Sequence, residues 1–223
     1  GIKLIATDNS QIVLIHMKLY AENFEYFYCE KKKTIGINMM NMFKLIKTMN
    51  NNDTLTLFIE KDNPNRLGIK INNIEKNAQT LFKMNLLDIS GDELSIPPAK
   101  FETELTLPSS DFQKIIRDMT NIGENIEIKS IGSQLLLNCS GDFASQETTL
   151  GETNNGLKFN QISPKELPIQ GVYSLKYLVL FTKCTGLCNQ INLYIKNDYP
   201  LVIKYAVASL GNIKLCLAPN TSN

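Results

Sequence analysis

Six basic residues are spaced three or seven positions apart within three short segments of the chain. They are Lys44, Lys47, Lys114, Arg117, Lys176 and Lys183. Residues at these spacings share one face of an α-helix. Lysine and arginine on such a face attract phosphate groups without reading base sequence, and the attraction weakens as salt rises. The alternative is that these are ordinary solvated helix faces, which are common in proteins that bind no nucleic acid.

The side chains that usually carry catalysis or bind metals form no recognisable arrangement. The only histidine, His16, stands in the run IVLIHMKL, which is typical of a structural strand. The five cysteines lack the paired short spacings of a zinc site, and we expect free intracellular thiols. No phosphate-cradling glycine loop, HExxH or GxSxG motif is present. Glu102 and Glu104 would share one face of a strand, as many solvated pairs do, and spacing alone does not exclude a carboxylate metal site. The sequence favours a protein that is not an enzyme and holds no metal or cofactor.

Length and charge narrow the classes of protein further. The 223 residues suffice for one large domain or two ordinary ones, and the net charge of +1 excludes a globally basic nucleic-acid binder. Basic residues gathered on one surface remain compatible with that charge. No apolar run approaches the about 18–20 residues that cross a bilayer, so we expect no membrane partner.

A unit of helix, strand, polar turn and strand occurs three times, and it would position the basic residues. Amphipathic segments open the copies at residues 41–49, 109–119 and 174–184. Pro108 precedes the second, which predicts Ser109 or Ser110 as the helix cap. Alternating apolar and polar residues predict strands at 54–60, 68–72, 101–107, 125–129 and 191–196. Turn-forming clusters stand at 61–65, 72–77, 155–160 and 197–200.

The segments on either side of the first copy suggest how the chain is organised. The opening of the chain, GIKLIATDNSQIVLIHMKL, resembles a fourth copy without its helix, so we expect a helical segment before Gly1. Residues 86–99 are acidic, contain Pro-Pro and lack a steady period, which is typical of a linker. We therefore predict a domain at 1–86, a connecting loop at 87–100 and a second domain at 101–223.

Several segments, in order, resemble the proliferating cell nuclear antigen family of DNA sliding clamps. They include TDNSQIVLI, GINMMNMFKLIK, LPSSDFQKIIRDMTNIGE, LDISGDELSIP, YLVLFTKCTGL and YPLVIKYAVASLGNIKLCLAP. The resemblance covers nearly the whole chain, and RDMTNIGE and LCLAP are its more specific parts.

This resemblance implies an α+β fold of two similar domains, with helices on the inner face and antiparallel sheets outside. Three subunits would join head to tail in a ring around duplex DNA, with the six basic residues facing the phosphates. Such a homotrimer serves as a polymerase processivity factor in DNA replication and repair and is placed on DNA by a clamp loader. The implied location is the nucleus, or a cytoplasmic replication site if the protein is viral.

The resemblance also implies two protein-binding surfaces. Peptides from polymerases, nucleases and ligases would bind a pocket formed by Ile12, Leu94, Ile96, Pro97, Pro200, Leu217, Ala218 and Pro219. Subunits would meet through Phe82 on one side and Phe143, Thr148 and Leu150 on the other. The chain departs from the family at Thr7, Gln11 and Cys216 in the pocket, which bears on partner preference. Gly132 stands near the position where many relatives carry a lysine that is a modification site.

Two other interpretations remain open at this point. One is a subunit of a heterotrimeric, checkpoint-type clamp, although the intact LCLAP segment and the linker pocket favour the replicative form. The other is a β-rich protein-interaction module without a DNA role. A stable homotrimer would separate the replicative clamp from both.

Overall fold

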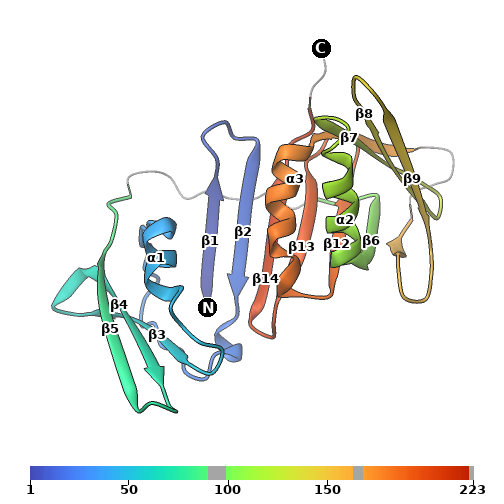
Figure 1. Cartoon of the computed structure of the whole chain (residues 1–223). Helices are drawn as coiled ribbons and strands as arrows, with labels where there is room; N and C mark the ends of the chain where they lie inside the picture. Colours follow the sequence, from blue (N-terminus) through green and yellow to red (C-terminus); the bar gives the residue numbers. More distant parts are fainter. Residues whose placement is uncertain (90–98, 163–167, 221–223) are drawn as a thin grey trace. The chain divides into compact units, whose positions relative to one another are not determined.

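The computed structural model describes residues 1–89, 99–162 and 168–220 (Figure 1). Their contacts divide the chain into two compact units, and each is described by itself. The larger unit comprises Gly1–Phe27 with the described part of Leu94–Asn223, and the smaller unit comprises the described part of Tyr28–Glu93. No helix in these described ranges combines the length and apolar character needed to cross a membrane.

The smaller unit is one short helix with a three-stranded antiparallel sheet. The helix is α1 (Met39–Ile46), and the sheet runs in the order β3 (Thr54–Glu60), β4 (Asn63–Asn73) and β5 (Ala78–Asn85). Met42 on the helix packs with Leu67 and Ile69 of the central strand and with Met84 of β5. Because these are alternate positions along the strands, one face of the sheet is covered by the helix.

The larger unit contains two antiparallel sheets. The seven-stranded sheet has the order β1 (Ile2–Thr7), β2 (Val13–Leu19), β14 (Gly211–Leu217), β13 (Leu201–Val207), β12 (Gln190–Ile195), β6 (Thr103–Pro108) and β10 (Lys158–Gln161). The four-stranded sheet has the order β11 (Ile169–Ser174), β7 (Asn125–Ile131), β8 (Gln134–Ser140) and β9 (Ser145–Gly151). A short 3-10 helix, η1 (Ala21–Asn23), follows β2.

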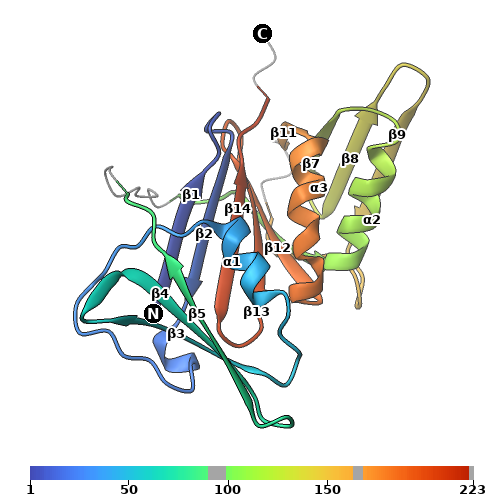
Figure 2. The same cartoon turned by 60° about the vertical axis from the view of Figure 1, so that its left-hand side comes forward.

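Two helices lie side by side in this unit, as Figures 1 and 2 both show. They are α2 (Ser109–Met119) and α3 (Leu175–Phe181), and α3 continues into the 3-10 helix η2 (Thr182–Leu187). Phe112, Ile116 and Met119 of α2 are fully buried in a core that the inward residues of both sheets complete. The amphipathic period therefore fixes which side of each helix remains exposed.

The predicted repeat is confirmed, and with it the α+β class and the antiparallel sheets. The three copies are α1 with β3 and β4, α2 with β7 and β8, and α3 with η2, β12 and β13. The hairpin of β1 and β2 is the related opening segment. The domain boundaries at residues 86 and 101 stay a prediction; by contacts, this hairpin belongs to the larger unit because β2 pairs with β14.

Three local predictions were wrong in detail. The turn expected at 61–65 is shorter, because Glu60 pairs with Asn63 and the strand β4 already begins there. The cluster at 155–160 contains part of β10, a short edge strand that pairs with β6. The third helix is α-helical only to Phe181 and continues as the 3-10 helix Thr182–Leu187.

The predicted serine cap of α2 is also wrong. Pro108 occupies the cap position, and no side chain caps the helix. The strand β6 continues through Pro108 opposite Gln190, so the backbone N–H of Ser109 donates to Asn189 O at 2.9 Å. This register turns the Ser109 side chain inward, where its hydroxyl donates to Cys188 O at 2.6 Å.

Candidate functional site

The exposed side of α2 carries two of the predicted basic residues. Lys114 and Arg117 are both exposed, whereas Phe112 and Ile116 on the opposite side are buried. Arg117 lies in the last turn, where the helix dipole favours a positive charge. The helical spacing therefore predicted the exposure of both side chains correctly.

The third repeat exposes the next two basic residues. Lys176 lies in the first turn of α3 and Lys183 lies in η2, and both are exposed. The ammonium group of Lys176 is 5.7 Å from the ring centroid of Tyr177. At that distance the aromatic face attracts the cation and restricts where the side chain points.

Hydrogen bonds between α2 and η2 fix these basic residues relative to one another. The side-chain amide of Gln113, next to Lys114, donates to Thr182 O at 2.9 Å, next to Lys183. Ser109 donates to Cys188 O at the far end of η2. Lys114, Arg117, Lys176 and Lys183 therefore belong to one rigid helical layer of the larger unit.

The helical layer is not uniformly positive. Asp111 and Asp118 are also exposed on α2, so its two carboxylates match the two charges of Lys114 and Arg117. No such carboxylate lies on α3 or η2. The positive field of this layer therefore comes mainly from Lys176 and Lys183.

The smaller unit presents the remaining two basic residues. Lys44 is exposed on α1, and Lys47 is exposed at the end of that helix. The side-chain oxygen of Asn38 accepts a hydrogen bond from Asn41 N at 3.0 Å and caps the helix. All six predicted basic residues are thus exposed on the repeated helical segments.

An apolar pocket of about 320 Å³ opens at the end of the seven-stranded sheet. Its walls bring together three predicted residues, Ile12, Pro200 and Ala218, from segments far apart in the sequence. The complete lining is Thr7, Gln11, Ile12, Leu14, Pro200, Cys216 and Ala218. The backbone N–H of Ala218 donates to Ile12 O at 2.9 Å and ties two of the walls together.

The turn between β1 and β2 shapes one side of this pocket. The Asp8 carboxylate accepts hydrogen bonds from the Ser10 hydroxyl and, at 2.8 Å, from Val13 N. These bonds to the ionised form lower the pKa of Asp8, the Ser10 contribution being the larger. Gln11 has a φ of 58°, which places its side chain at the pocket rim through a left-handed turn.

The other predicted pocket residues divide into three groups. Leu217 is fully buried in the core and does not line the pocket, because its neighbour Cys216 faces outward instead. Pro219 is half-buried and lies outside the lining. Leu94, Ile96 and Pro97 fall outside the described residues. Leu14 was missed, although a period of two from Ile12 places it on the same face.

The residues predicted for subunit contact lie on or beside edge strands of their sheets. Phe82 is on β5, which ends the three-stranded sheet, and its half-buried ring also packs against the core of the smaller unit. Thr148 and Leu150 are half-buried on β9, which ends the four-stranded sheet. Phe143, in the turn before β9, is 77% exposed.

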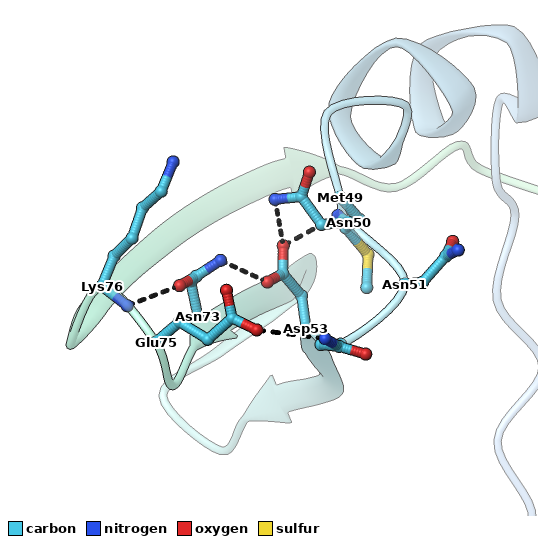
Figure 3. A pocket seen from close by; sticks show the side chains of 8 residues that line it. Met49, Asn50, Asn51, Asp53, Asn73, Glu75 and Lys76 are labelled. Carbon is cyan, nitrogen blue, oxygen red and sulfur yellow. Dashed lines mark hydrogen bonds between the residues drawn. The ribbon is translucent and has the colours of Figure 1, made fainter.

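A second, polar pocket of about 550 Å³ lies in the smaller unit (Figure 3). Asp53 is at its centre and accepts hydrogen bonds from Asn50 N at 2.9 Å and from Asn73 Nδ2 at 2.6 Å. Glu75 accepts from Asn52 Nδ2 at 3.1 Å. Its carboxylates thus hold the two turns together, and the described residues contain no cluster of three metal-ligating side chains.

Comparisons with known proteins cover the chain almost end to end. Residues 1–93 match the family model for the N-terminal domain of proliferating cell nuclear antigen, and residues 95–220 match the model for its C-terminal domain. The two matches meet in the segment that the sequence predicted as a connecting loop.

Two curated relatives support the same assignment. A protein of Paramecium bursaria Chlorella virus 1 described as a probable DNA polymerase sliding clamp is 36% identical, over 98% of this chain and 84% of its own length. The proliferating cell nuclear antigen of Chaetomium thermophilum is 31% identical, over 98% of this chain and 85% of its own. With the helix repeat, the antiparallel sheets and both domain matches, the chain belongs to the proliferating cell nuclear antigen family.

Proposed function

We propose that this protein is a DNA sliding clamp that encircles duplex DNA and tethers replication enzymes to it. The observation that carries the proposal is the recurrence of exposed basic residues on the helical segment of all three repeats, in a chain of this family. No catalytic role is needed, since retention on DNA would come from topology.

The chemistry of the helical layer suits a protein that slides. Lysine and arginine contacts to phosphate are independent of sequence, and non-specific binding of this kind is weak, about 10⁻⁴–10⁻⁶ M at physiological salt. Asp111 and Asp118 on α2 moderate the attraction further. A clamp needs this weakness, because tight or base-specific contacts would stop it from moving along the duplex.

The apolar pocket is the proposed attachment point for enzyme partners. Ile12, Leu14 and Ala218 give it an apolar lining, and Thr7 and Gln11 give it a polar rim. Such a surface accepts a short peptide that inserts a few apolar side chains. Polymerases, nucleases and ligases that carry peptides of this kind are the proposed partners, in replication and repair at a nuclear or viral replication site.

The proposed ring is a homotrimer joined through β5 of one subunit and β9 of the next, and opened by a clamp loader. Each strand is the edge of its sheet in the described chain, so pairing them would satisfy backbone groups that an edge leaves unpaired. Phe143 beside β9 and Phe82 on β5 supply aromatic surface for this contact.

Binding to a fluorescent DNA duplex over a salt series tests the DNA role. The variant Lys114→Gln/Lys176→Gln/Lys183→Gln removes three charges from the helical layer. The control Lys70→Gln/Lys129→Gln/Lys158→Gln removes three charges from strands. Each lost phosphate contact should reduce the slope of log K against log salt by about 0.9, so the helix variant loses up to about 2.7. Equal slopes for the helix variant and the control would contradict the DNA role.

Light scattering tests the ring. A homotrimer has three times the monomer mass of 25.1 kDa. Phe82→Ala removes part of the proposed contact but also touches the core of its own unit, whereas Phe143→Ser changes only an exposed ring. We expect both variants to shift the trimer toward monomer. A wild-type monomer at micromolar concentration would instead point to a heterotrimer subunit or an interaction module.

A further inference from the structure

A row of basic side chains crosses the seven-stranded sheet on the face away from its core. His16 of β2 is the direct cross-strand partner of Lys214 on β14, and Lys214 is the direct partner of Lys204 on β13. Directly opposite residues of antiparallel strands point to the same face. Their neighbours along the strands, Ile203 and Leu215, are buried in the core, so the row faces outward.

A second pair extends the row toward the edge of the sheet. Lys18 lies two residues beyond His16 on β2, and Lys3 of β1 is its cross-strand partner. Both are exposed, and the Lys18 ammonium group lies 4.9 Å from the ring centroid of Tyr20. We call Lys3, His16, Lys18, Lys204 and Lys214 together the basic surface.

The strands that carry the basic surface supply no neutralising charge. The four strands that carry it, β1, β2, β13 and β14, contain no aspartate or glutamate. Within the described chain no ion pair involves its lysines. Burial and then the charges of Lys214, Lys3 and Lys18 lower the pKa of His16, so the positive field of these three lysines extends over the His16 position. An anion placed over them would relieve this repulsion.

The basic surface is continuous with the apolar pocket. Leu14 and Cys216, which line the pocket, are direct cross-strand partners and lie two residues from His16 and Lys214 along the same strands. Two residues along a strand span about 6.5–7 Å and return to the same face. A peptide with an apolar side chain at Cys216 therefore places its next residues within reach of the lysine side chains.

We infer that the basic surface binds an acidic segment that flanks the apolar anchor of a partner peptide. This inference rests on the proposed peptide-binding function of the pocket and adds a charge preference to it. An extended flank projects alternate side chains toward the sheet every about 6.5–7 Å, which is close to the spacing between the His16 row and the Lys18 row. A peptide is favoured over nucleic acid because the basic surface continues directly from an apolar lining that would anchor it.

Two synthetic peptides test the inference by fluorescence anisotropy with the full chain. Both carry the same anchor of leucine and phenylalanine side chains, and they differ only in a flank of glutamates or of glutamines. We expect the glutamate peptide to bind about tenfold more tightly at about 50 mM salt, from several exposed ion pairs that are individually weak. In about 1 M salt, where the Debye length is near 3 Å, the two affinities should become nearly equal.

Variants that lack lysine charges test whether the basic surface causes the preference for the glutamate peptide. Lys204→Gln/Lys214→Gln should reduce the preference for glutamate to about threefold or less. The control Lys70→Gln/Lys129→Gln, with the same loss of charge on other sheets, should leave it at about tenfold. The glutamine peptide should bind both variants as it binds the wild type, which shows that the pocket is intact.

Each other outcome overturns the inference in a distinguishable way. If the glutamine peptide binds but glutamates add nothing, the charge preference is wrong and the pocket function stands. If neither peptide binds, the pocket function fails and the inference fails with it. If Lys204→Gln/Lys214→Gln weakens binding to duplex DNA but leaves both peptide affinities unchanged, the basic surface serves nucleic acid instead.

Discussion

Replacing Ser109 by alanine should loosen the joint between α2 and η2. Ser109 is only 3% exposed, and its hydroxyl donates to Cys188 O at 2.6 Å, with Thr185 O at 3.4 Å. Removing a donor from a buried carbonyl costs about 1–3 kcal/mol. Because Thr185 and Cys188 are themselves only half-buried, water can partly replace the hydroxyl, so we expect about 1 kcal/mol.

Urea unfolding measures this cost, and the chain supplies both the signal and a control. Tyr173 and Tyr205 are fully buried in the larger unit, so near-ultraviolet circular dichroism follows the unfolding of that unit. With a slope of about 1–3 kcal/mol per M, Ser109→Ala should lower the midpoint by about 0.3–1 M. Ser110→Ala removes an exposed hydroxyl that donates to its neighbour Asp111 at 3.5 Å, and it should cost under about 0.5 kcal/mol. Equal midpoints for the two variants would refute the reasoning.

Three further predictions concern other parts of the chain. Gly68→Val should destabilise the smaller unit by about 1–3 kcal/mol, because a Cβ there would meet the Phe58 ring at 2.4 Å. Hydrogen exchange of the β4 amides should accelerate as a result. The control Gly186→Ala places its Cβ in open space and should have little effect on stability. Burial lowers the pKa of His16 from its ordinary value of 6.5, so the unfolded chain binds more protons than the folded one and stability falls as the pH drops below about 6.5. His16→Gln should therefore weaken the pH dependence of the unfolding free energy below about pH 6.5, and an unchanged dependence would contradict the shift. Burial raises the pKa of Cys216 to about 11, so a thiol reagent at about pH 8 should modify the exposed Cys29 well before Cys216. Mass spectrometry follows the two modifications, and equal modification rates would contradict the burial of Cys216.

The alternation of apolar and polar residues predicted five strands, because each of them packs one face against a core. The strand at 54–60 was predicted to the residue, and those at 125 and 191 began within a residue of the observed start. The start of β4 was missed, because Asn63, Pro64 and Asn65 are turn formers by themselves. The pairing of Asn63 with Glu60 makes Asn63 the first residue of β4, and such pairing depends on the sheet and not on the local sequence.

Among the candidate sites, local spacing likewise predicted only the basic residues, each group of which lies within a single helical segment. Helical spacing predicted the exposed side of α2, since Phe112 and Ile116 leave only one side for Lys114 and Arg117. The pocket could not be found by spacing, because its lining joins residues 7–14 to residues 200–218; the family resemblance named its members except Leu14. The basic surface was missed altogether. Residues 16, 204 and 214 become neighbours only through strand register.

The pairing of β2 with β14 has a consequence for how the chain folds during synthesis. Val13 pairs with Leu217, so the partner of β2 is translated about 200 residues after it. Until then the β1–β2 hairpin has an open edge, and isolated hairpins are marginally stable. At about 5–20 residues per second, this interval lasts roughly 10–40 s. The nascent hairpin is therefore open to wrong partners throughout this interval, and we expect it to be a site of chaperone binding or intermolecular strand pairing.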